Sequence, residues 1–397
     1  GDIFGRKRIL LAAATLFGVA SLAGGLAPDE GVLIAARVIQ GVGAAGMITV
    51  GIAAVTNAFP AERVGAAIGI VYTAGGVGSA LGPLVGGVLT TFVSWRLVLL
   101  VNVPLMVVLI AIIIRSVDES RDESAPRHID LPGLILIAAG LSLATFGVDS
   151  AQSEGWSSAR TIAPIVAGVA LLAAFVGVER RVRFPLVDLR LFRNHPFVVV
   201  MLAGGVAQLP WVGTIFLSAI YLQDVRGLSA ATAGVVFLPL SVGAAVAGYY
   251  SGRLGRFLPQ QVMMAALVVG GGAVIGLALI ESWAPYLAML LIVGLGAGLG
   301  FAYASVGTQT VVPPARAGEA SGIVFTVLVS ASALIVAAMS TVLSLGTDGR
   351  IATSPDLEDT IQPMLVWIGA ISIVAGIATL VAGRVTRDEI DELQQRR

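Results

Sequence analysis

Cysteine is absent from this chain of 397 residues, and lysine occurs once, at Lys7. Without cysteine the chain has no disulfide, no thiolate metal site and no thiol nucleophile. A single lysine outside any Gly-x-x-x-x-Gly-Lys sequence excludes a Walker phosphate-binding loop. Both histidines, His128 and His195, fall in loops between apolar runs, and the runs themselves hold no His/Asp/Ser constellation. We therefore expect no metal site, no cofactor and no enzymatic activity.

Charged residues are also scarce, at 12% of the chain, while apolar residues make up 57% and the mean hydropathy is +0.94. Soluble proteins carry about 25% charged residues. Apolar runs long enough for a helix to cross a bilayer fill almost the whole sequence, and lipid admits only helices or closed barrels. This predicts an all-α integral membrane protein with twelve transmembrane helices, at residues 9–26, 31–57, 64–92, 96–115, 131–149, 162–178, 197–222, 230–250, 261–280, 285–306, 318–345 and 363–383.

The basic residues divide unequally between the two sets of connecting loops. One set, which includes both ends of the chain, holds nineteen Lys and Arg residues, and the opposite set holds four. Because basic loops stay in the cytoplasm, this imbalance places both termini in the cytoplasm, and we expect a multi-pass protein of the plasma membrane. The lipid bilayer is the expected surrounding. A net charge of zero and the lack of a basic surface argue against nucleic-acid binding.

Two charged segments, near residues 116–130 and 179–195, interrupt the spans and are the expected linkers. The acidic segment 346–362 is expected to be a solvated loop. The predicted parts are the remainder of an N-terminal four-helix bundle at 1–115, a two-helix insert with its linkers at 116–195, a C-terminal six-helix bundle at 196–383 and a cytoplasmic tail at 384–397.

The opening G-D-I-F-G-R-K-R resembles the latter part of the signature loop between helices two and three of the major facilitator superfamily. In that family the acid and the basic residues of this loop make charged contacts across the cytoplasmic ends of the two helical halves. The segment S-G-R-L-G-R-F at 251–257 looks like a degenerate second copy, as expected of a repeated six-helix unit. An ordinary basic turn is the alternative for each. The resemblance makes a candidate cytoplasmic gate of Asp2, Gly5, Arg6, Arg8, Arg253 and Arg256.

Arg37 is the one charged residue placed well inside a predicted span. A charge in hydrocarbon is costly, so such a residue usually faces a wet cavity and has a partner. The surrounding L-I-A-A-R-V-I-Q-G-V-G-A-A-G resembles the Arg motif of the superfamily, which the family links to proton coupling. By this resemblance Arg37 and Gln40 are candidate coupling residues. The alternative is that Arg37 snorkels to the outer interface. The embedded G-V-G-A-A-G matches a dinucleotide fingerprint in spacing alone, because it lies in the middle of an apolar run of membrane length and not in a soluble parallel sheet.

The third predicted span places Gly78, Gly82 and Gly86 four residues apart, on one helical face. Small residues at this spacing let another backbone approach closely. Pro83 removes a backbone donor and favours a bend. The ending G-P-L-V-G-G, up to Gly87, resembles the antiporter motif that the family associates with exporters. Plain helix packing is the alternative interpretation.

Further segments look like the drug:proton antiporter branch with fourteen helices, namely W-R-L-V-L-L-V-N-V-P at 95–104, Y-L-Q-D-V-R-G-L-S at 221–229 and G-E-A-S-G at 318–322. If the chain is aligned with that branch, the predicted spans are helices three to fourteen, and the first two helices are lacking. The two-helix insert is then the pair that distinguishes this branch from relatives with twelve helices. The family commonly places a coupling acid in the first helix. We place no Asp or Glu in the interior of a span, so the coupling acid stays unassigned.

The resemblance implies a secondary active transporter that exports small hydrophobic or cationic compounds in exchange for protons. Two alternatives stay open: an uncoupled or differently coupled metabolite exporter or facilitator, and a truncated membrane remnant that does not transport. We expect a monomer. Aromatic and amide groups suit a cavity for a planar or cationic molecule, although each alone also fits interhelical packing. The candidate cavity residues are Tyr72, Gln208, Trp211, Tyr303 and Gln309.

Overall fold

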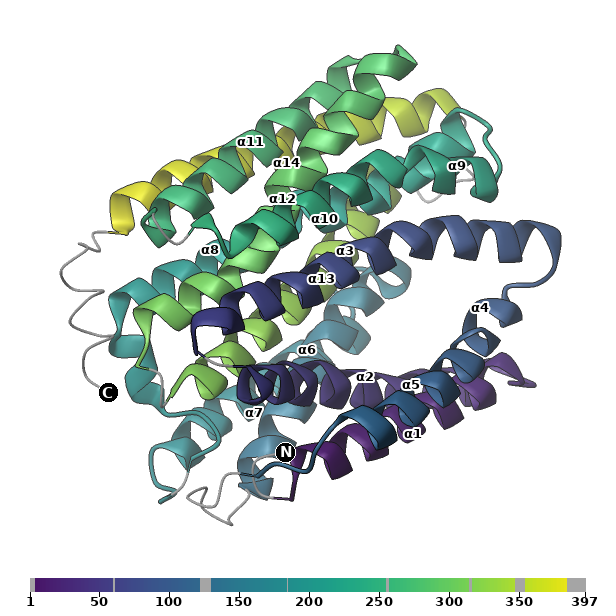
Figure 1. Ribbon diagram of the computed structural model, residues 1–397. Coiled ribbons are helices and arrows are strands. Elements are labelled where there is room, and N and C mark those ends of the chain that lie inside the picture. Colours follow the sequence, from purple (N-terminus) through teal and green to yellow (C-terminus); the bar gives the residue numbers. More distant parts are fainter. Residues whose placement is uncertain are drawn as a thin grey trace. The chain divides into compact units, whose positions relative to one another are not determined.

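The computed structural model describes residues 4–59, 61–121, 130–183, 185–254, 257–313, 316–346 and 354–383. These residues form helices joined by short connections, with no strand among them (Figure 1). The helices fall into two compact units. The expectation of an all-helical fold is confirmed.

The first unit contains residues 1–127 together with 229–238. Within this unit α1 packs along α2 and α5, and α3 packs along α9. Its helices are α1 (Arg6–Gly25), α2 (Glu30–Ala58), α3 (Ala61–Phe92), α4 (Arg96–Leu100), α5 (Asn102–Ser116) and α9 (Ala230–Val236).

The second unit contains residues 128–228 and 239–397. Within it α6 pairs with α7 and also contacts α13, while α8, α11, α12 and α14 pack together. Its elements are α6 (Leu131–Glu154), α7 (Ala159–Glu179), the 3-10 helix η1 (Leu189–Arg193), α8 (His195–Ile220), the π-helical turn η2 (Tyr221–Val225), α10 (Leu238–Ser251), α11 (Pro259–Leu279), α12 (Trp283–Val311), α13 (Ala317–Gly346) and α14 (Ser354–Ala382).

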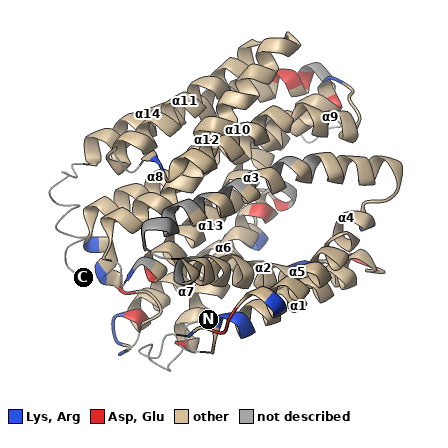
Figure 2. Ribbon diagram, in the orientation of Figure 1, with Lys and Arg blue, Asp and Glu red and all other residues tan. Residues whose placement is uncertain are grey.

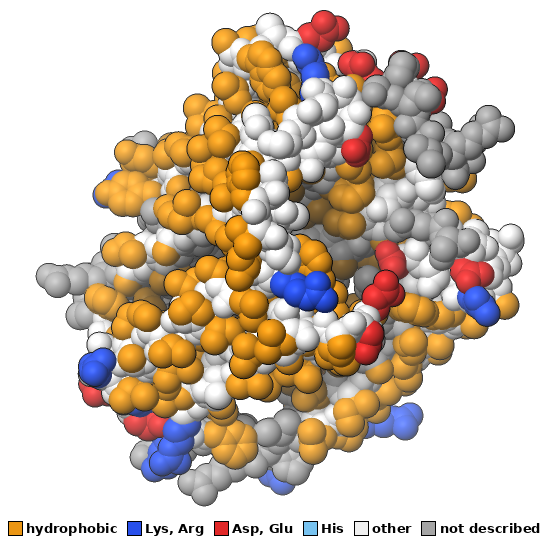
Figure 3. Space-filling model, turned by 90° about the vertical axis from the view of Figure 1, so that its right-hand side faces the viewer, with side chains coloured by type: hydrophobic (Ala, Val, Ile, Leu, Met, Phe, Trp, Pro, Cys, Tyr) orange, Lys and Arg blue, Asp and Glu red, His pale blue; other side chains and the backbone are white. Residues whose placement is uncertain are grey.

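Eleven segments of the described residues are long and apolar enough to cross a membrane. They correspond to all the predicted spans except 64–92, which is the 32-residue helix α3, where several side chains lie outside the described part. Apolar side chains also cover much of the face in Figure 3, and Val107, Trp367 and Val374 are each more than 60% exposed. In water such a surface is unfavourable, whereas hydrocarbon solvates it. Most charged residues of each unit lie at or beyond helix ends (Figure 2).

Prolines divide two of the predicted spans into pairs of helices. Span 96–115 breaks at Val101 into α4 and α5, and span 230–250 breaks at Phe237 into α9 and α10. Pro104 and Pro239 lie shortly after these breaks. Each lacks the N–H that would donate to the carbonyl four residues earlier, so the helical ladder is interrupted there.

Two sequence-based expectations are wrong in detail. Residues 354–362 belong to α14 and do not form a solvated loop, because the acidic residues of this segment fit the first turns of a helix, where they interact favourably with the helix dipole. Asp149 lies inside α6 and Glu319 lies inside α13, so two helices do contain acids, at the last residue of predicted span 131–149 and the second residue of predicted span 318–345. Residues 347–353 and the tail at 384–397 lie outside the described residues.

Glycines on α12 allow close packing of neighbouring helices in the second unit. A Cβ built on Gly294 would overlap the carbonyl oxygen of Leu240 in α10, and one built on Gly298 would fall 2.6 Å from Ala244 Cα of the same helix. Gly296 makes the corresponding approach to Gly270 of α11, at 2.6 Å from its Cα. The glycine series of α12 therefore lets α10 and α11 pack closely against two sides of this helix, because no side chain separates the backbones.

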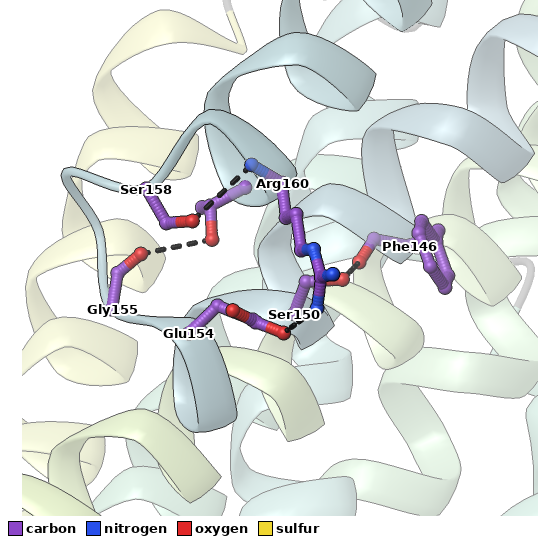
Figure 4. A network of polar contacts seen from close by, with 7 residues as sticks. Phe146, Ser150, Glu154, Gly155, Ser158 and Arg160 are labelled. Atoms are coloured by element: carbon purple, nitrogen blue, oxygen red, sulfur yellow. Dashed lines mark hydrogen bonds and ion pairs between the residues drawn. The ribbon is translucent and has the colours of Figure 1, made fainter.

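The α6–α7 hairpin is closed by a polar network at one end (Figure 4). Arg160 pairs with Glu154 at 2.8 Å, and the Ser158 side chain accepts from the backbone N–H of Arg160 at 3.2 Å. Thr161 Oγ1 donates to the Gly155 carbonyl at 2.9 Å. Gly155 has a φ of 80°, a left-handed conformation that favours glycine, so the turn fits this sequence.

Candidate functional site

Arg37 and Gln40 lie one helical turn apart on α2 and are brought together by the structure. The Arg37 guanidinium donates to Gln40 Oε1 in a short hydrogen bond. The other end of the Gln40 amide, Nε2, donates to Ser21 Oγ of α1 at 2.6 Å. One amide therefore connects the arginine of α2 to the neighbouring helix.

This network runs from a buried end at Ser21 to an exposed end at Arg37. Gln40 is 4% exposed and Ser21 is fully buried, whereas Arg37 is exposed. The exposed guanidinium has its charge outside the α1–α2 contact, and the buried amide has both of its polar atoms paired, which avoids the cost of an unpaired buried group. In the described part of the chain Arg37 binds an amide rather than a carboxylate. Sequence analysis missed Ser21, because a lone serine in an apolar run carries no distinctive signal.

The opening basic turn contacts the segment that follows α5 in the same unit. The Arg6 backbone N–H donates to the Ser120 carbonyl at 2.8 Å, and the Lys7 N–H donates to Glu119 Oε1 at 3.1 Å. Arg8 lies 3.5 Å from Glu119 Oε2 across an exposed ion pair. Gly5 has a φ of 99°, so it turns the chain toward α1 in a conformation that side chains disfavour. Glu119 is the partner that sequence analysis did not identify.

The second basic turn is arranged differently. Arg253 donates to Tyr249 Oη at 2.9 Å, and its guanidinium carbon lies 4.4 Å from the Tyr249 ring centroid and 5.4 Å from that of Tyr250. A guanidinium over aromatic rings is stabilised by the ring quadrupole. Asp2 and Arg256, the other predicted members of the gate, lie outside the described residues. The gate role of these residues stays a prediction.

The glycines of the antiporter motif split into two groups on α3. Among the described residues, no heavy atom lies within 4 Å of a Cβ built on Gly78, Gly82 or Gly86. A Cβ on Gly87 would overlap the carbonyl oxygen of Ala230 in α9. The close backbone approach expected for the face of Gly78, Gly82 and Gly86 occurs instead at Gly87. The backbone of α3 continues as one helix through Pro83, whose side chain is outside the described part.

Gln208 makes an interhelical hydrogen bond inside the second unit. Its Nε2 donates to Ser332 Oγ of α13 at 2.8 Å, and Ser332 in turn donates to the Leu328 carbonyl at 2.9 Å. Gln208 is 5% exposed, and its Oε1 has no hydrogen-bond partner among the described residues. A buried amide oxygen without a donor is costly and is a natural acceptor for a ligand N–H or O–H.

The other predicted cavity residues differ in burial. Tyr303 of α12 is fully buried and packs with Ala207, Met263 and Leu267 in a hydrophobic cluster. Trp211 in α8 and Gln309 in α12 are partly buried. The Tyr72 side chain lies outside the described residues, although its backbone belongs to α3. The structure therefore places Tyr303 in core packing, while Gln208 retains an unused polar atom.

A charged cluster that sequence analysis missed fastens η1 to α13. The Asp188 carboxylate pairs with Arg316 in a short ion pair, and the Asp188 backbone N–H donates to the Glu319 carboxylate. The Arg190 N–H donates to Asp188 Oδ1 at 2.9 Å and lowers the pKa of that carboxyl, to which the Arg316 guanidinium adds. Opposite charges at spacings of more than a hundred residues gave no sequence signal.

Comparison with known proteins places the chain in a family. Residues 1–337 match the model of the Major Facilitator Superfamily. The chain belongs to the major facilitator superfamily. It is thus a multi-pass membrane transporter rather than an enzyme, and it acts on small molecules.

Two relatives resemble this superfamily member over most of its length. The chain is 35% identical over 401 residues to the puromycin resistance protein pur8 of Streptomyces alboniger, covering 96% of this chain and 78% of that protein. It is 34% identical over 399 residues to the cephamycin export protein CmcT of Amycolatopsis lactamdurans, covering 96% of this chain and 80% of that protein.

Among solved structures, the crystal structure of a peptide transporter POT in complex with sulfate is similar at a TM-score of 0.65 and 16% identity, over 99% of this chain and 82% of that chain. At this identity the similarity supports the fold alone.

Proposed function

We propose that this superfamily member exports small hydrophobic or cationic organic compounds across the plasma membrane in exchange for protons, with both termini in the cytoplasm. The observation that carries the proposal is the similarity over 96% of the chain to proteins named for puromycin resistance and cephamycin export. The excess of basic residues in one set of loops supports the orientation.

We further assign the protein to the drug:proton antiporter branch with fourteen helices. The α6–α7 hairpin supports this assignment, since it lies as an additional pair between the four spans that end with α5 and the six spans that begin with α8. Alternating access would come from the two halves moving about a central site, as in other transporters built from repeats.

Within this proposal Arg37 and Gln40 form the coupling region. The exposed guanidinium, which stays positively charged, repels a proton or cation that binds nearby, and the buried Gln40–Ser21 bond transmits its position to α1. Gln208 offers the substrate an amide oxygen that is buried and unpaired among the described residues. Because Arg37 binds an amide and no carboxylate in the described part, uncoupled export is the alternative function.

The test is efflux of a fluorescent organic cation from cells that lack their own pumps and express the full-length protein. Efflux that stops both with a protonophore and in Arg37→Ala supports proton-coupled export through Arg37. Arg160→Ala is the matched control, because Arg160 is an exposed arginine whose ion pair closes the α6–α7 turn. Efflux that persists with the protonophore would instead indicate the uncoupled exporter.

A further inference from the structure

Two buried carboxyl groups meet where α6 begins and α7 ends. Asp130 is 5% exposed and Glu179 is 4% exposed. Asp130 Oδ1 accepts the Gly133 N–H at 2.9 Å, which caps α6. Glu179 Oε2 accepts the Val187 N–H at 3.1 Å from the linker that follows α7. Each carboxyl group thus has one oxygen held by the backbone.

The remaining two oxygens lie next to each other. Asp130 Oδ2 and Glu179 Oε1 are buried and have no N–H partner among the described residues. A Cβ built on Gly133 would overlap Asp130 Oδ2 and would fall 2.5 Å from Glu179 Oε1. Both oxygens therefore lie beside the same point. Because both oxygens lie within 2.5 Å of that same point, the two carboxyl groups are direct neighbours. Two ionised carboxylates only accept hydrogen bonds, whereas a protonated one donates.

Among the described residues, no cationic side chain is a hydrogen-bond partner of the two remaining oxygens. The charge that acts on Glu179 comes from Asp130. Arg316 and Glu319, at the start of the packed helix α13, are engaged with Asp188. Residues 122–129, which include Arg127 and His128, lie outside the described part. The other charged groups on the adjoining linker and η1 are Arg180, Arg181, Arg183, Arg190 and Arg193.

We propose that Asp130 and Glu179 bind one proton between them, held between Oδ2 and Oε1, and that this shared hydrogen fastens the linker 180–188 to the α6–α7 hairpin. Two adjacent carboxyl groups in a buried site do not both ionise, because the two negative charges would repel each other. One of the two therefore keeps its proton. The hydrogen satisfies both oxygens that otherwise lack a donor. The proposal is independent of whether transport is driven by protons.

Loss of this proton has a structural consequence. Two adjacent carboxylates repel each other, and Glu179 then no longer holds the Val187 N–H in place. Val187 directly precedes Asp188, which binds Arg316 in front of α13. Proton occupancy at the hairpin is therefore connected through one short segment to the start of α13.

Infrared spectroscopy of the purified protein tests the proposal through the C=O stretch of a protonated carboxylic acid at neutral pH. Asp130→Asn and Glu179→Gln are suitable variants, because each keeps an oxygen for its backbone N–H and places an amide donor against the remaining carboxylate. Asparagine is also a good helix cap. Glu154→Gln is the matched control, since it removes an exposed carboxylate of the same hairpin that pairs with Arg160 (Figure 4).

The expected result is a protonated-acid band in the wild type that either single variant removes and that Glu154→Gln leaves intact. Raising the pH should abolish the band and lower the wild-type unfolding temperature, because the folded pair binds a proton that the unfolded chain releases. The unfolding temperature of Asp130→Asn should lack this decline. If a variant does not yield a monodisperse protein, the wild type alone provides the test: the protonated-acid band and the unfolding temperature should then fall together as the pH is raised.

Two results would overturn the proposal. One is a wild-type spectrum without the band at neutral pH, or with a band that both variants leave undiminished. The other is a wild type whose unfolding temperature falls on addition of a chelator, because the two carboxylates would then hold a metal cation.

Discussion

Gln40 of α2 is hydrogen-bonded to Ser21 of α1 through Nε2 and Oγ, at 2.6 Å, while its own Oε1 accepts from Arg37. The α1–α2 contact is otherwise built from small residues: a Cβ on Gly43 would fall 2.8 Å from the Phe17 backbone nitrogen, and one on Gly46 would fall 2.9 Å from Ala13 Cβ. The amide thus makes a polar contact inside a tightly packed apolar interface, and it orients Arg37, the one arginine of α2.

Removal of the Ser21 hydroxyl should weaken this contact modestly. Ser21→Ala leaves the buried Gln40 Nε2 without an acceptor, and we expect a loss of about 0.6 to 2 kcal/mol in unfolding free energy, the range for interhelical hydrogen bonds in membranes. Thermal unfolding followed by tryptophan fluorescence measures it. Thr49→Val is the control on α2, because the Thr49 hydroxyl donates within its own helix to Ala45. Equal losses in both variants would contradict a specific role for the Gln40–Ser21 bond.

The helical spans and the Arg37 site were predictable from sequence because each has a local signal. Hydropathy over about twenty residues marks a span, and one arginine in an apolar run marks a polar site. The partners were not predictable, since Ser21, Glu119 and Asp188 are ordinary residues whose roles arise from distant contacts. The helical breaks at Val101 and Phe237 were also missed, although Pro104 and Pro239 give a local reason for them.

Asp188 should give the protein an acid-sensitive stability. Its pKa is lowered, first by the Arg190 N–H and then by Arg316, so the folded state favours the charged carboxylate. Its stabilisation is present above the unfolded pKa of about 3.9 and is lost as the pH falls through the folded value. For a partly exposed group we expect at most about 1 kcal/mol.

Thermal unfolding between about pH 6 and pH 3 checks this prediction, with the reference pKa near 3.9 inside the range. Asp188→Asn keeps an oxygen for the Arg190 N–H but loses the ion pair with Arg316, so its unfolding temperature should decline less steeply below pH 4. A variant with the same acid dependence as the wild type would show that other carboxylates dominate. The stability that Asp188 provides is lost as the pH falls, whereas the stability expected from Asp130 and Glu179 is lost as the pH rises.

Gly294→Ala should destabilise the second unit severely. The added methyl group would occupy the position of the Leu240 carbonyl oxygen, which belongs to backbone and cannot rotate away, so α10 and α12 would have to separate. We expect a loss of about 3 kcal/mol, at the upper end of the usual cost of overpacking. Gly272→Ala in α11 is the matched control: no heavy atom of the described residues lies within 4 Å of its Cβ, and helix propensity predicts a gain of about 1 kcal/mol. Similar unfolding temperatures for the two variants would contradict the close α10–α12 packing.

The antiporter-motif helix offers a test that separates stability from transport. Gly87→Ala should weaken the α3–α9 contact, because its methyl group would overlap the Ala230 carbonyl oxygen. Gly82→Leu should leave the unfolding temperature near that of the wild type, since no described heavy atom lies within 4 Å of its Cβ. If the face of Gly78, Gly82 and Gly86 receives another helix during the transport cycle, the leucine blocks that approach. We therefore expect Gly82→Leu to be a folded protein without efflux. Normal efflux from this variant would mean that the glycine face stays open throughout the cycle, and that Gly87 alone carries the packing role of the motif.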